Sequence, residues 1–181
     1  MDKFDYLILP GLGNSGPNHW QTLWENKLPN YSRISQNNWD NPSFYEWLFQ
    51  LNQTISNLKR PTIIIAHSLA VPLLARWHKL YSSPNIVFAM LVAPADVDST
   101  DHTPDIIRDF SPIPLDQFSF PSVVISSDND PFMNQARAKF LADKWGSDFF
   151  NVGSIGHIND ASNIGDWPQG FSILEKYINK Y

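Results

Sequence analysis

A buried strand that turns directly into a helix is encoded near the middle of the chain. Residues 62–65, Thr-Ile-Ile-Ile, form a β-branched apolar run, which is typical of a buried strand in a parallel sheet. The next apolar residues follow helical spacing and are predicted to share one helix face: Leu69, Leu73, Trp77 and Leu80. The chain must therefore turn sharply between the two patterns, and Ser68 stands at that corner.

A corner of this kind needs small residues, because the strand and the helix approach each other closely there. Ala66 and Ala70 lie two residues before and two residues after Ser68 and meet this requirement. The serine would project above the sheet beside the helix N-terminus, as in the nucleophile elbow Gly-x-Ser-x-Gly. Both glycines of that pattern are alanine here, and the alternative is that Ser68 only caps the helix that follows it.

The rest of the chain alternates short strands with amphipathic helices. The predicted strands cover residues 4–9, 31–35, 62–65, 85–92, 122–126 and 149–152. The predicted helices cover residues 18–28, 43–58, 69–80, 132–145 and 167–178, with Asp166 as the last N-cap and Gly146 as a C-cap. Residues 93–120 contain four prolines and are predicted to be mostly loop, with room for a short helix at 105–110. This alternation predicts an α/β fold of three layers around a mostly parallel sheet, in a single domain spanning residues 1–181.

Composition excludes several classes of function. The net charge of -5 argues against a nucleic-acid or anionic-membrane partner, because binding to phosphates needs a cationic surface. The chain has no cysteine, so it can form neither a disulfide framework nor a thiolate metal site. It begins without the basic segment and long apolar run of a signal peptide, and the apolar run 86–94 is too short to span a bilayer. We expect a cytoplasmic protein, monomeric and acting on a small molecule.

Polar residues of three chemical types follow the predicted strands. Ligands of open parallel sheets bind at the carboxyl ends of the strands, where Ser68, the pair Asp128 and Asp130, and His157 would meet. Their order, Ser then Asp then His, is that of the α/β-hydrolases. Ser68 would be the nucleophile, His157 its base, and one of the two aspartates the group that orients the imidazole. Taken singly, the aspartates fit a turn and His157 fits a loop histidine, so the joint arrangement carries this hypothesis.

The first predicted strand leads into the glycine loop 11–16, Gly-Leu-Gly-Asn-Ser-Gly, which has two possible roles. It matches Gly-x-Gly-x-x-Gly, the pattern of dinucleotide-binding folds. Against that role, the second strand ends in Ser35 and Gln36 without an acidic residue, and Pro17 occupies the start of the helix. In a hydrolase the loop would instead place the backbone N–H of Leu12 beside that of Leu69 as an oxyanion hole. We favour the oxyanion hole and expect no cofactor.

Other candidate residues concern the substrate pocket. Leu12, His19, Trp39 and residues of the 93–120 segment are predicted to form its walls. No metal site is expected, because the remaining histidines have no metal-ligand spacing. His19 and the others are interpreted as structural or surface residues: His67, His78 and His102.

The sequence resembles the small, lidless α/β-hydrolases typified by human retinoblastoma-binding protein nine and the bacterial YdeN-type proteins. The resemblance rests on the segments 9–16, 19–20, 66–69, 91–96, 127–132, 145–147, 156–159 and 166–168. It implies a six-stranded sheet in the order 2-1-3-4-5-6 without a lid domain. It also implies a triad of Ser68, Asp130 and His157, because the acid of that family directly precedes a proline. Ala70 departs from the glycine that many members carry.

Members of that family are serine hydrolases with esterase or amidase activity on small substrates. The sequence therefore leads to the hypothesis of a serine hydrolase that cleaves small carboxylic esters, or less favourably amides or peptides, through an acyl-enzyme on Ser68. The alternative from a different class is a non-catalytic protein that keeps the α/β-hydrolase fold and binds a small ligand.

Overall fold

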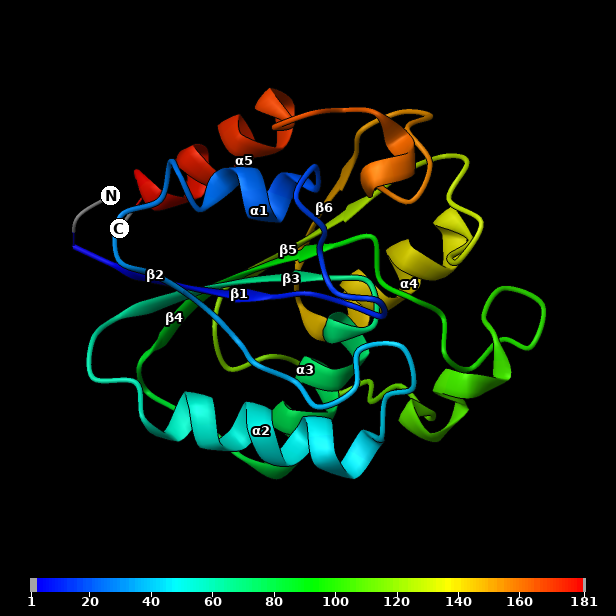
Figure 1. Ribbon diagram of the computed structural model, residues 1–181, viewed down its shortest axis with the longest axis horizontal. Helices are drawn as coiled ribbons and strands as arrows, with labels where there is room; N and C mark the ends of the chain where they lie inside the picture. The colour runs from blue at the N-terminus through cyan, green and yellow to red at the C-terminus, as the bar shows by residue number, and fades with distance from the viewer. Residues whose placement is uncertain (1–2, 181) are drawn as a thin grey trace.

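The computed structural model describes residues 3–180 and contains a six-stranded parallel sheet in the order β2-β1-β3-β4-β5-β6 (Figure 1). The strands are β1 (Asp5–Leu9), β2 (Tyr31–Arg33), β3 (Thr62–His67), β4 (Ile86–Val92), β5 (Ser122–Ser126) and β6 (Asp148–Asn151). Every neighbouring pair is parallel. This order is the one implied by the resemblance, so the predicted α/β-hydrolase fold class is confirmed.

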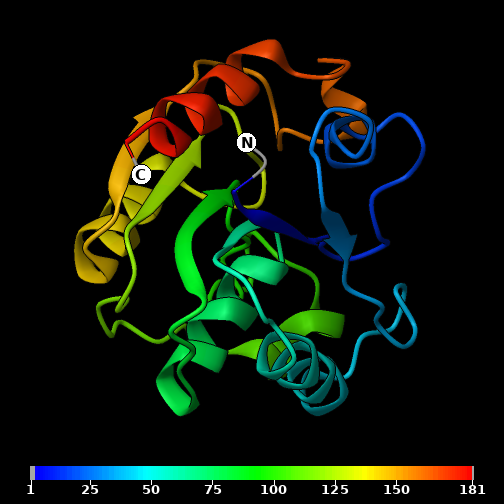
Figure 2. The same ribbon diagram turned by 90° about the vertical axis from the view of Figure 1, so that its left-hand side faces the viewer.

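Helices cover both faces of the sheet, which gives the three predicted layers (Figures 1 and 2). One face carries α2 (Phe44–Ser56), α3 (Ala70–Leu80) and α4 (Gln135–Trp145). The other face carries α1 (Trp20–Trp24) and α5 (Pro168–Ile178). Two short 3₁₀ helices, η1 (Asp105–Phe110) and η2 (Asp160–Ser162), lie in the connections. The prolines of segment 93–120 thus permit only the short helix that was predicted there.

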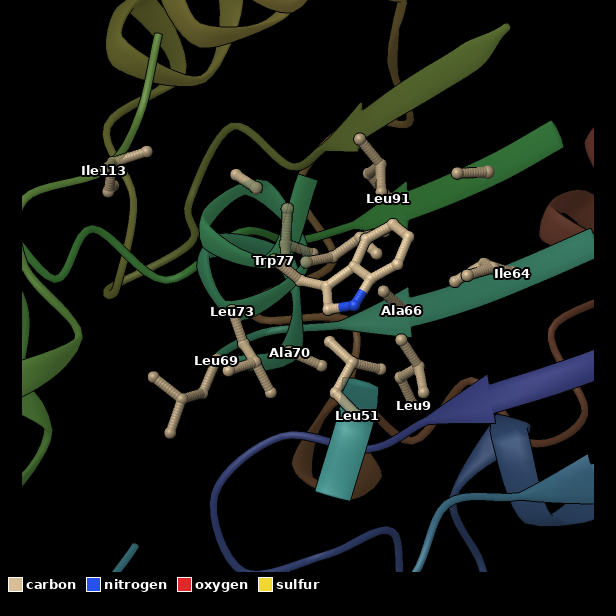
Figure 3. Packing of buried hydrophobic residues seen from close by; sticks show 14 of the residues in the cluster. Leu9, Leu51, Ile64, Ala66, Leu69, Ala70, Leu73, Trp77, Leu91 and Ile113 are labelled. Atoms are coloured by element: carbon tan, nitrogen blue, oxygen red, sulfur yellow. The ribbon is translucent and has the colours of Figure 1, made fainter. Parts of the chain in front are cut away.

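Successive residues of the central strands enter two separate cores, because side chains alternate between the faces of a sheet. Ile64 and Ala66 of β3 pack with α2 and α3, whereas Ile63 and Ile65 pack with α1 and α5. In Figure 3 the Trp77 side chain projects from α3 toward the strand face that carries Ala66. This two-sided burial explains why β3 reads as a continuous apolar run and not as an alternating one.

The predicted corner between strand and helix is present. β3 ends at His67, α3 begins at Ala70, and Ser68 adopts a left-handed φ of 57°. A non-glycine residue in that region is strained, as expected at a nucleophile elbow. The Ser68 N–H donates to the carbonyl of Val92 at 3.0 Å, which ties the corner to the end of β4. Leu69, Leu73 and Trp77 of the predicted helix face are buried, whereas Leu80 lies at the helix end and is 56% exposed.

The first helix is much shorter than the predicted 18–28, because its N-cap and its end are both set by local contacts. The His19 side chain accepts a hydrogen bond from the Gln21 N–H and starts the helix there. After Trp24 the chain tightens, and the Lys27 N–H donates to the carbonyl of Trp24 at 2.8 Å. Pro29 follows, and the residues before a proline avoid the helical region.

Two further helix starts differ from the prediction. α4 begins at Gln135 instead of residue 132, because the Asn134 side chain accepts from the Ala136 N–H and acts as the N-cap. Trp167, and not Asp166, is the N-cap of α5; Asp166 pairs with Lys27 instead. Gly146 ends α4 in the left-handed conformation with φ 69°, as predicted. Within residues 3–180, no helix is long and apolar enough to cross a membrane.

Candidate active site

The carboxyl ends of β3 and β5, together with the loop after β6, bring Ser68, His157 and Asp130 into contact. His157 Nε2 lies 2.8 Å from the Ser68 hydroxyl oxygen. On the other side of the ring, Nδ1 lies 2.9 Å from both Asp130 carboxylate oxygens. A carboxylate that accepts from Nδ1 leaves Nε2 free to take a proton from the serine. The arrangement can activate a hydroxyl for nucleophilic attack.

The two candidate aspartates lie in different surroundings. The Asp130 side chain is 1% exposed, and its Oδ1 also accepts from the Phe132 N–H at 2.9 Å. Asp128 points away from His157 to the surface, where its carboxylate accepts from the Asn151 amide at 2.6 Å. Of the two aspartates, only Asp130 therefore contacts the imidazole. Asp130 is also the aspartate that the resemblance implies.

The loop that carries His157 is held in place by the turn after β5. The Asn129 side-chain oxygen accepts from the Gly156 N–H at 2.7 Å and from the Ser127 hydroxyl at 3.0 Å. The same Ser127 oxygen accepts from the Ile155 N–H at 2.9 Å. The sequence analysis missed this role of Ser127 and Asn129, and the one available signal was that both lie in the Ser-Asp-Asn-Asp turn beside Asp130.

Two buried aromatic side chains donate hydrogen bonds to the backbone at His157 and Ile158. His67 Nε2–H donates to the carbonyl of His157 at 3.0 Å, and Trp20 Nε1–H donates to the carbonyl of Ile158 at 2.7 Å. His67 therefore has the structural role assigned to it from the sequence. Its partner lies 90 residues further along the chain, so sequence spacing gave no sign of the contact.

His19 and His67 are neutral in the folded protein. Burial, followed by the positive charge of Arg33, lowers the pKa of His19 to about 3. Burial, followed by the neighbouring His19, holds the pKa of His67 well below its ordinary value. The two ring centroids lie 4.8 Å apart, so a charge on either ring would lie close to the other buried histidine. Both are expected to stay uncharged wherever the protein is folded.

This neutrality predicts a loss of stability on acidification from pH 7 to pH 5. The unfolded histidines titrate near their ordinary value while the folded ones resist protonation, so the unfolded state binds more protons and stability falls as pH falls. For His19, the free energy of unfolding should drop by about 1.4 kcal/mol per pH unit below about 6.5, or about 2 kcal/mol at pH 5. Urea unfolding at the two pH values measures the loss.

The fall in unfolding free energy between pH 7 and pH 5 should be smaller in His67→Asn. It should be unchanged in the control His102→Asn, which alters a half-exposed histidine. An equal loss in wild type and His67→Asn would contradict the assignment of a buried neutral His67.

The backbone N–H groups of Leu12 and Leu69 are available for a ligand. Among residues 3–180, neither N–H has a hydrogen-bond acceptor. Gly11 packs directly on the elbow, since a Cβ added there would lie 2.8 Å from the Ser68 Cβ and 3.1 Å from the Leu69 nitrogen. Two unsatisfied donors beside a nucleophile fit an oxyanion hole, and the glycine loop thus forms a wall of this site.

Replacement of Gly11 by alanine is expected to lower both activity and melting temperature. The added methyl would meet the Ser68 Cβ and two backbone atoms at 2.8 to 3.1 Å, and none of them is the end of a flexible chain. The elbow must move, and a displacement of about 1 Å at a reacting group costs about 10²-fold in rate. Ester hydrolysis and thermal unfolding of Gly11→Ala measure the two effects.

Gly153→Ala is the matched control, because nothing lies within 4 Å of its added Cβ and only its φ of 83° is strained. It should lower the melting temperature modestly and leave kcat near wild type. Full activity in Gly11→Ala would contradict the close approach of the loop to the elbow.

Two cavities meet at Ser68, His157 and Leu12. The first, of about 260 Å³, is lined mainly by apolar residues: Leu69, Ala95, Pro104, Ile107 and Phe132. The second, of about 290 Å³, is lined mainly by polar ones: Asn14, His19, Asn159 and Asp160. His19 and the 93–120 segment thus lie where the sequence analysis placed them. Trp39 lines neither cavity; its ring packs against Trp47 at 5.3 Å.

A larger surface hollow of about 430 Å³ lies beside Arg76 and Pro112, away from these groups. Within residues 3–180, no group of three or more histidine, aspartate or glutamate side chains is arranged to hold a metal ion.

Comparison with known proteins gives one family and many related folds. The family model of the serine hydrolases matches residues 6–176. A Pectobacterium atrosepticum protein described as a YdeN-like hydrolase is 30% identical, with a TM-score of 0.84 over 97% of this chain and 90% of that chain. The ydeN gene product from B. subtilis is 21% identical, with a TM-score of 0.81 over 97% and 99% of the two chains.

More distant structures share the fold alone. Est1E from Butyrivibrio proteoclasticus, solved with ferulic acid bound, is 10% identical, with a TM-score of 0.72 over 97% of this chain and 88% of that chain. The curated proteins contain no match.

Proposed function

This chain belongs to the serine hydrolase family and is a YdeN-like serine hydrolase, and we propose that it cleaves small carboxylic esters through an acyl-enzyme on Ser68. The observation that carries the proposal is the continuous set of contacts from Ser68 through His157 to Asp130, at 2.8 and 2.9 Å. A serine hydroxyl is inert at neutral pH without such a base, so these contacts supply what the reaction needs.

In the first half of the proposed reaction, the Ser68 oxygen attacks the ester carbonyl while His157 Nε2 takes the serine proton. Asp130 accepts from Nδ1–H and stabilises the imidazolium that forms. The carbonyl oxygen becomes negative and accepts hydrogen bonds from the N–H groups of Leu12 and Leu69. The imidazolium then gives its proton to the alcohol oxygen, the carbon–oxygen bond breaks, and the alcohol leaves.

In the second half, water replaces the alcohol. His157 takes a proton from the water, which attacks the acyl carbon, and the tetrahedral species again uses the two N–H groups. His157 then returns the proton to the Ser68 oxygen as the acid is released. No cofactor takes part in this scheme, and amides would follow the same steps with a poorer leaving group.

We place the acyl group in the apolar cavity. Leu69 lines this cavity and not the polar one, so the residue that would bind the carbonyl oxygen is beside the apolar walls. The polar cavity shares Asn159 and Asp160 with a further cavity of about 320 Å³, which offers the released alcohol a way out. Burial of an acyl chain against apolar walls makes the free energy of binding more favourable by about 0.8 kcal/mol per methylene.

The size of the apolar cavity predicts an optimum acyl length. In a series of p-nitrophenyl esters, kcat/KM should rise from acetate to butyrate or hexanoate as methylenes are buried, and then fall once the chain exceeds about 260 Å³. Initial rates across the series measure this profile. A steady rise to palmitate would contradict the small-substrate proposal, and no turnover of any ester would contradict ester hydrolysis itself.

A further inference from the structure

The polar cavity beside Ser68 is built differently from the apolar one, and the proposed reaction does not by itself explain it. Asn14, His19, Asn159 and Asp160 bring side-chain hydrogen-bonding groups to its walls. The adjoining cavity adds Asn18 and Asn163, so the polar lining extends outward from the reacting serine.

His19 supplies a cavity-facing donor that nothing in the described chain uses. The residue is only 4% exposed, and its Nδ1 accepts from the Gln21 N–H at 3.2 Å. Since the ring is neutral, its single proton must then lie on Nε2. Within residues 3–180 that N–H has no hydrogen-bond partner. The Nε2–H is not one of the fully enclosed donors of the described residues, and His19 lines the cavity, so a ligand oxygen there can accept from it.

Asp160 supplies acceptors on the same cavity. Its Oδ2 lies 3.1 Å from the position of a Cβ added to Gly16, which places the carboxylate over the glycine loop. It forms no ion pair or side-chain hydrogen bond within residues 3–180. Asn14 and Asn159 bring amide groups to the same walls, although the Asn14 oxygen already accepts from Arg33. The cavity thus presents both donors and acceptors.

The charges of the walls favour a neutral ligand. An anion would be repelled by Asp160, and neither His19 nor His67 would offer it a positive charge, because both stay neutral. A cation would face the His19 N–H and would lie near the Arg33 guanidinium, which is bound to Glu25 at 2.6 Å. A hydroxyl group both donates and accepts, so it can satisfy His19 and Asp160 together.

From this arrangement we propose that the polar cavity binds a neutral, hydroxyl-rich alcohol, such as glycerol or a monosaccharide, as the leaving group of the ester. His19 Nε2–H donates to one hydroxyl oxygen, and Asp160 accepts from a hydroxyl. The inference rests on the proposed ester hydrolysis and adds the class of alcohol. His19 is then a specificity-determining residue, and the polar lining toward Asn163 accommodates the more distant hydroxyls of a sugar.

The test compares esters that share one acyl group and differ in hydroxyls. 1-Monobutyrin is paired with propyl butyrate, and methyl 6-O-butyryl-glucoside with cyclohexylmethyl butyrate. In the wild type the hydroxylated member of each pair should have a kcat/KM at least about tenfold higher, the effect of about one hydrogen bond. The readout is the ratio within each pair, so that a partly unfolded variant does not change it.

Two substitutions of His19 separate binding from capping. His19→Asn keeps an oxygen that can accept from the Gln21 N–H but does not reach the Nε2 position, and it should bring the ratio close to one. His19→Gln places an amide N–H near Nε2 and should retain part of the preference. Asp160→Asn should lower the ratio, whereas His78→Asn, a histidine bonded to Ser119 outside both cavities, should leave it unchanged.

Equal kcat/KM values within both pairs would overturn the inference while ester hydrolysis stood. A ratio retained in His19→Asn would overturn the assignment of His19. A preference for butyrylcholine over 3,3-dimethylbutyl butyrate, with none for the hydroxylated esters, would show a cation site instead. Absence of hydrolysis of every ester, p-nitrophenyl butyrate included, would overturn the proposed function together with this inference.

Discussion

Ser68→Ala is expected to lower kcat/KM for p-nitrophenyl butyrate by about 10⁴-fold or more, because no other group replaces the nucleophile. The fold should survive, since alanine is small and the strained φ of 57° at this position already belongs to a non-glycine residue. Initial rates and a thermal melt of the same preparation separate loss of chemistry from loss of structure.

Ser43→Ala is the matched control. Ser43 is the N-cap residue of α2, and its side chain makes no capping hydrogen bond; Ser68 lies two residues before α3, and its hydroxyl contacts His157 instead. Its removal should change neither the rate nor the melting temperature appreciably. A Ser68→Ala enzyme that kept more than about a tenth of the wild-type rate would place the nucleophile elsewhere.

The second large effect is expected from the acid. Asp130→Asn should lower kcat by about 10³- to 10⁴-fold, because a neutral amide does not stabilise the imidazolium as a carboxylate does, and its N–H can donate to Nδ1 and fix the wrong imidazole tautomer. Asp128→Asn makes the same chemical change two residues away, where the carboxylate contacts Asn151 at the surface. It should leave kcat near wild type. Steady-state kinetics of the pair compare the two positions directly.

The reverse order, with Asp128→Asn inactive and Asp130→Asn active, would mean that the wrong carboxylate has been assigned. Similar losses in both would point to collapse of the turn that holds the His157 loop, and a melt of each variant would reveal it. The contacts of Asn129 with Gly156 make this control necessary.

The strands of the sheet and the elbow could be predicted because each depends on a pattern of neighbouring residues. The run of β-branched residues before Ser68 and the helical spacing after Leu69 each need only a few neighbouring residues to be recognised. The same locality applies to Gly146, whose left-handed conformation ends α4. The strand order, in contrast, came from the resemblance, because no local pattern states which strands are neighbours.

The supports of the site depend on contacts between distant parts of the chain. His67 meets the His157 carbonyl across 90 residues, and Trp20 meets Ile158 across 138. The spacing of these residues in the sequence does not predict either contact. His67 and Trp20 could be predicted to be buried or structural, but not to hold the backbone of the histidine that faces Ser68.

Errors in the helix boundaries have a related cause. The predicted starts at residues 18 and 132 followed apolar spacing, while the real ends are set by side chains that compete for backbone groups. His19 and Asn134 accept from the N–H two residues ahead, and both contacts begin a helix later than the periodicity suggests. Asp166 fails as a cap because Lys27, from a distant segment, takes its carboxylate.

The glycine loop shows how one pattern fits two chemistries. Gly-x-Gly-x-x-Gly between a strand and a helix predicts equally a phosphate loop and a wall beside an elbow. The packing of Gly11 against Ser68 favours the second, because the glycine is needed for close approach to the elbow itself. The sequence favours the same interpretation, because Ser35 and Gln36 end the second predicted strand, where a dinucleotide-binding fold has an acidic residue.

The central claim is that Ser68 is the nucleophile of a working hydrolase, and a fluorophosphonate probe tests it most directly. Its phosphorus reacts with an activated serine and leaves a covalent adduct that mass spectrometry assigns to one peptide. The account predicts a single adduct on Ser68 in the wild type, slower labelling in His157→Ala, and none in Ser68→Ala. An adduct on another residue, or no adduct on a folded wild type, would contradict the account and favour a non-catalytic binding protein on the same fold.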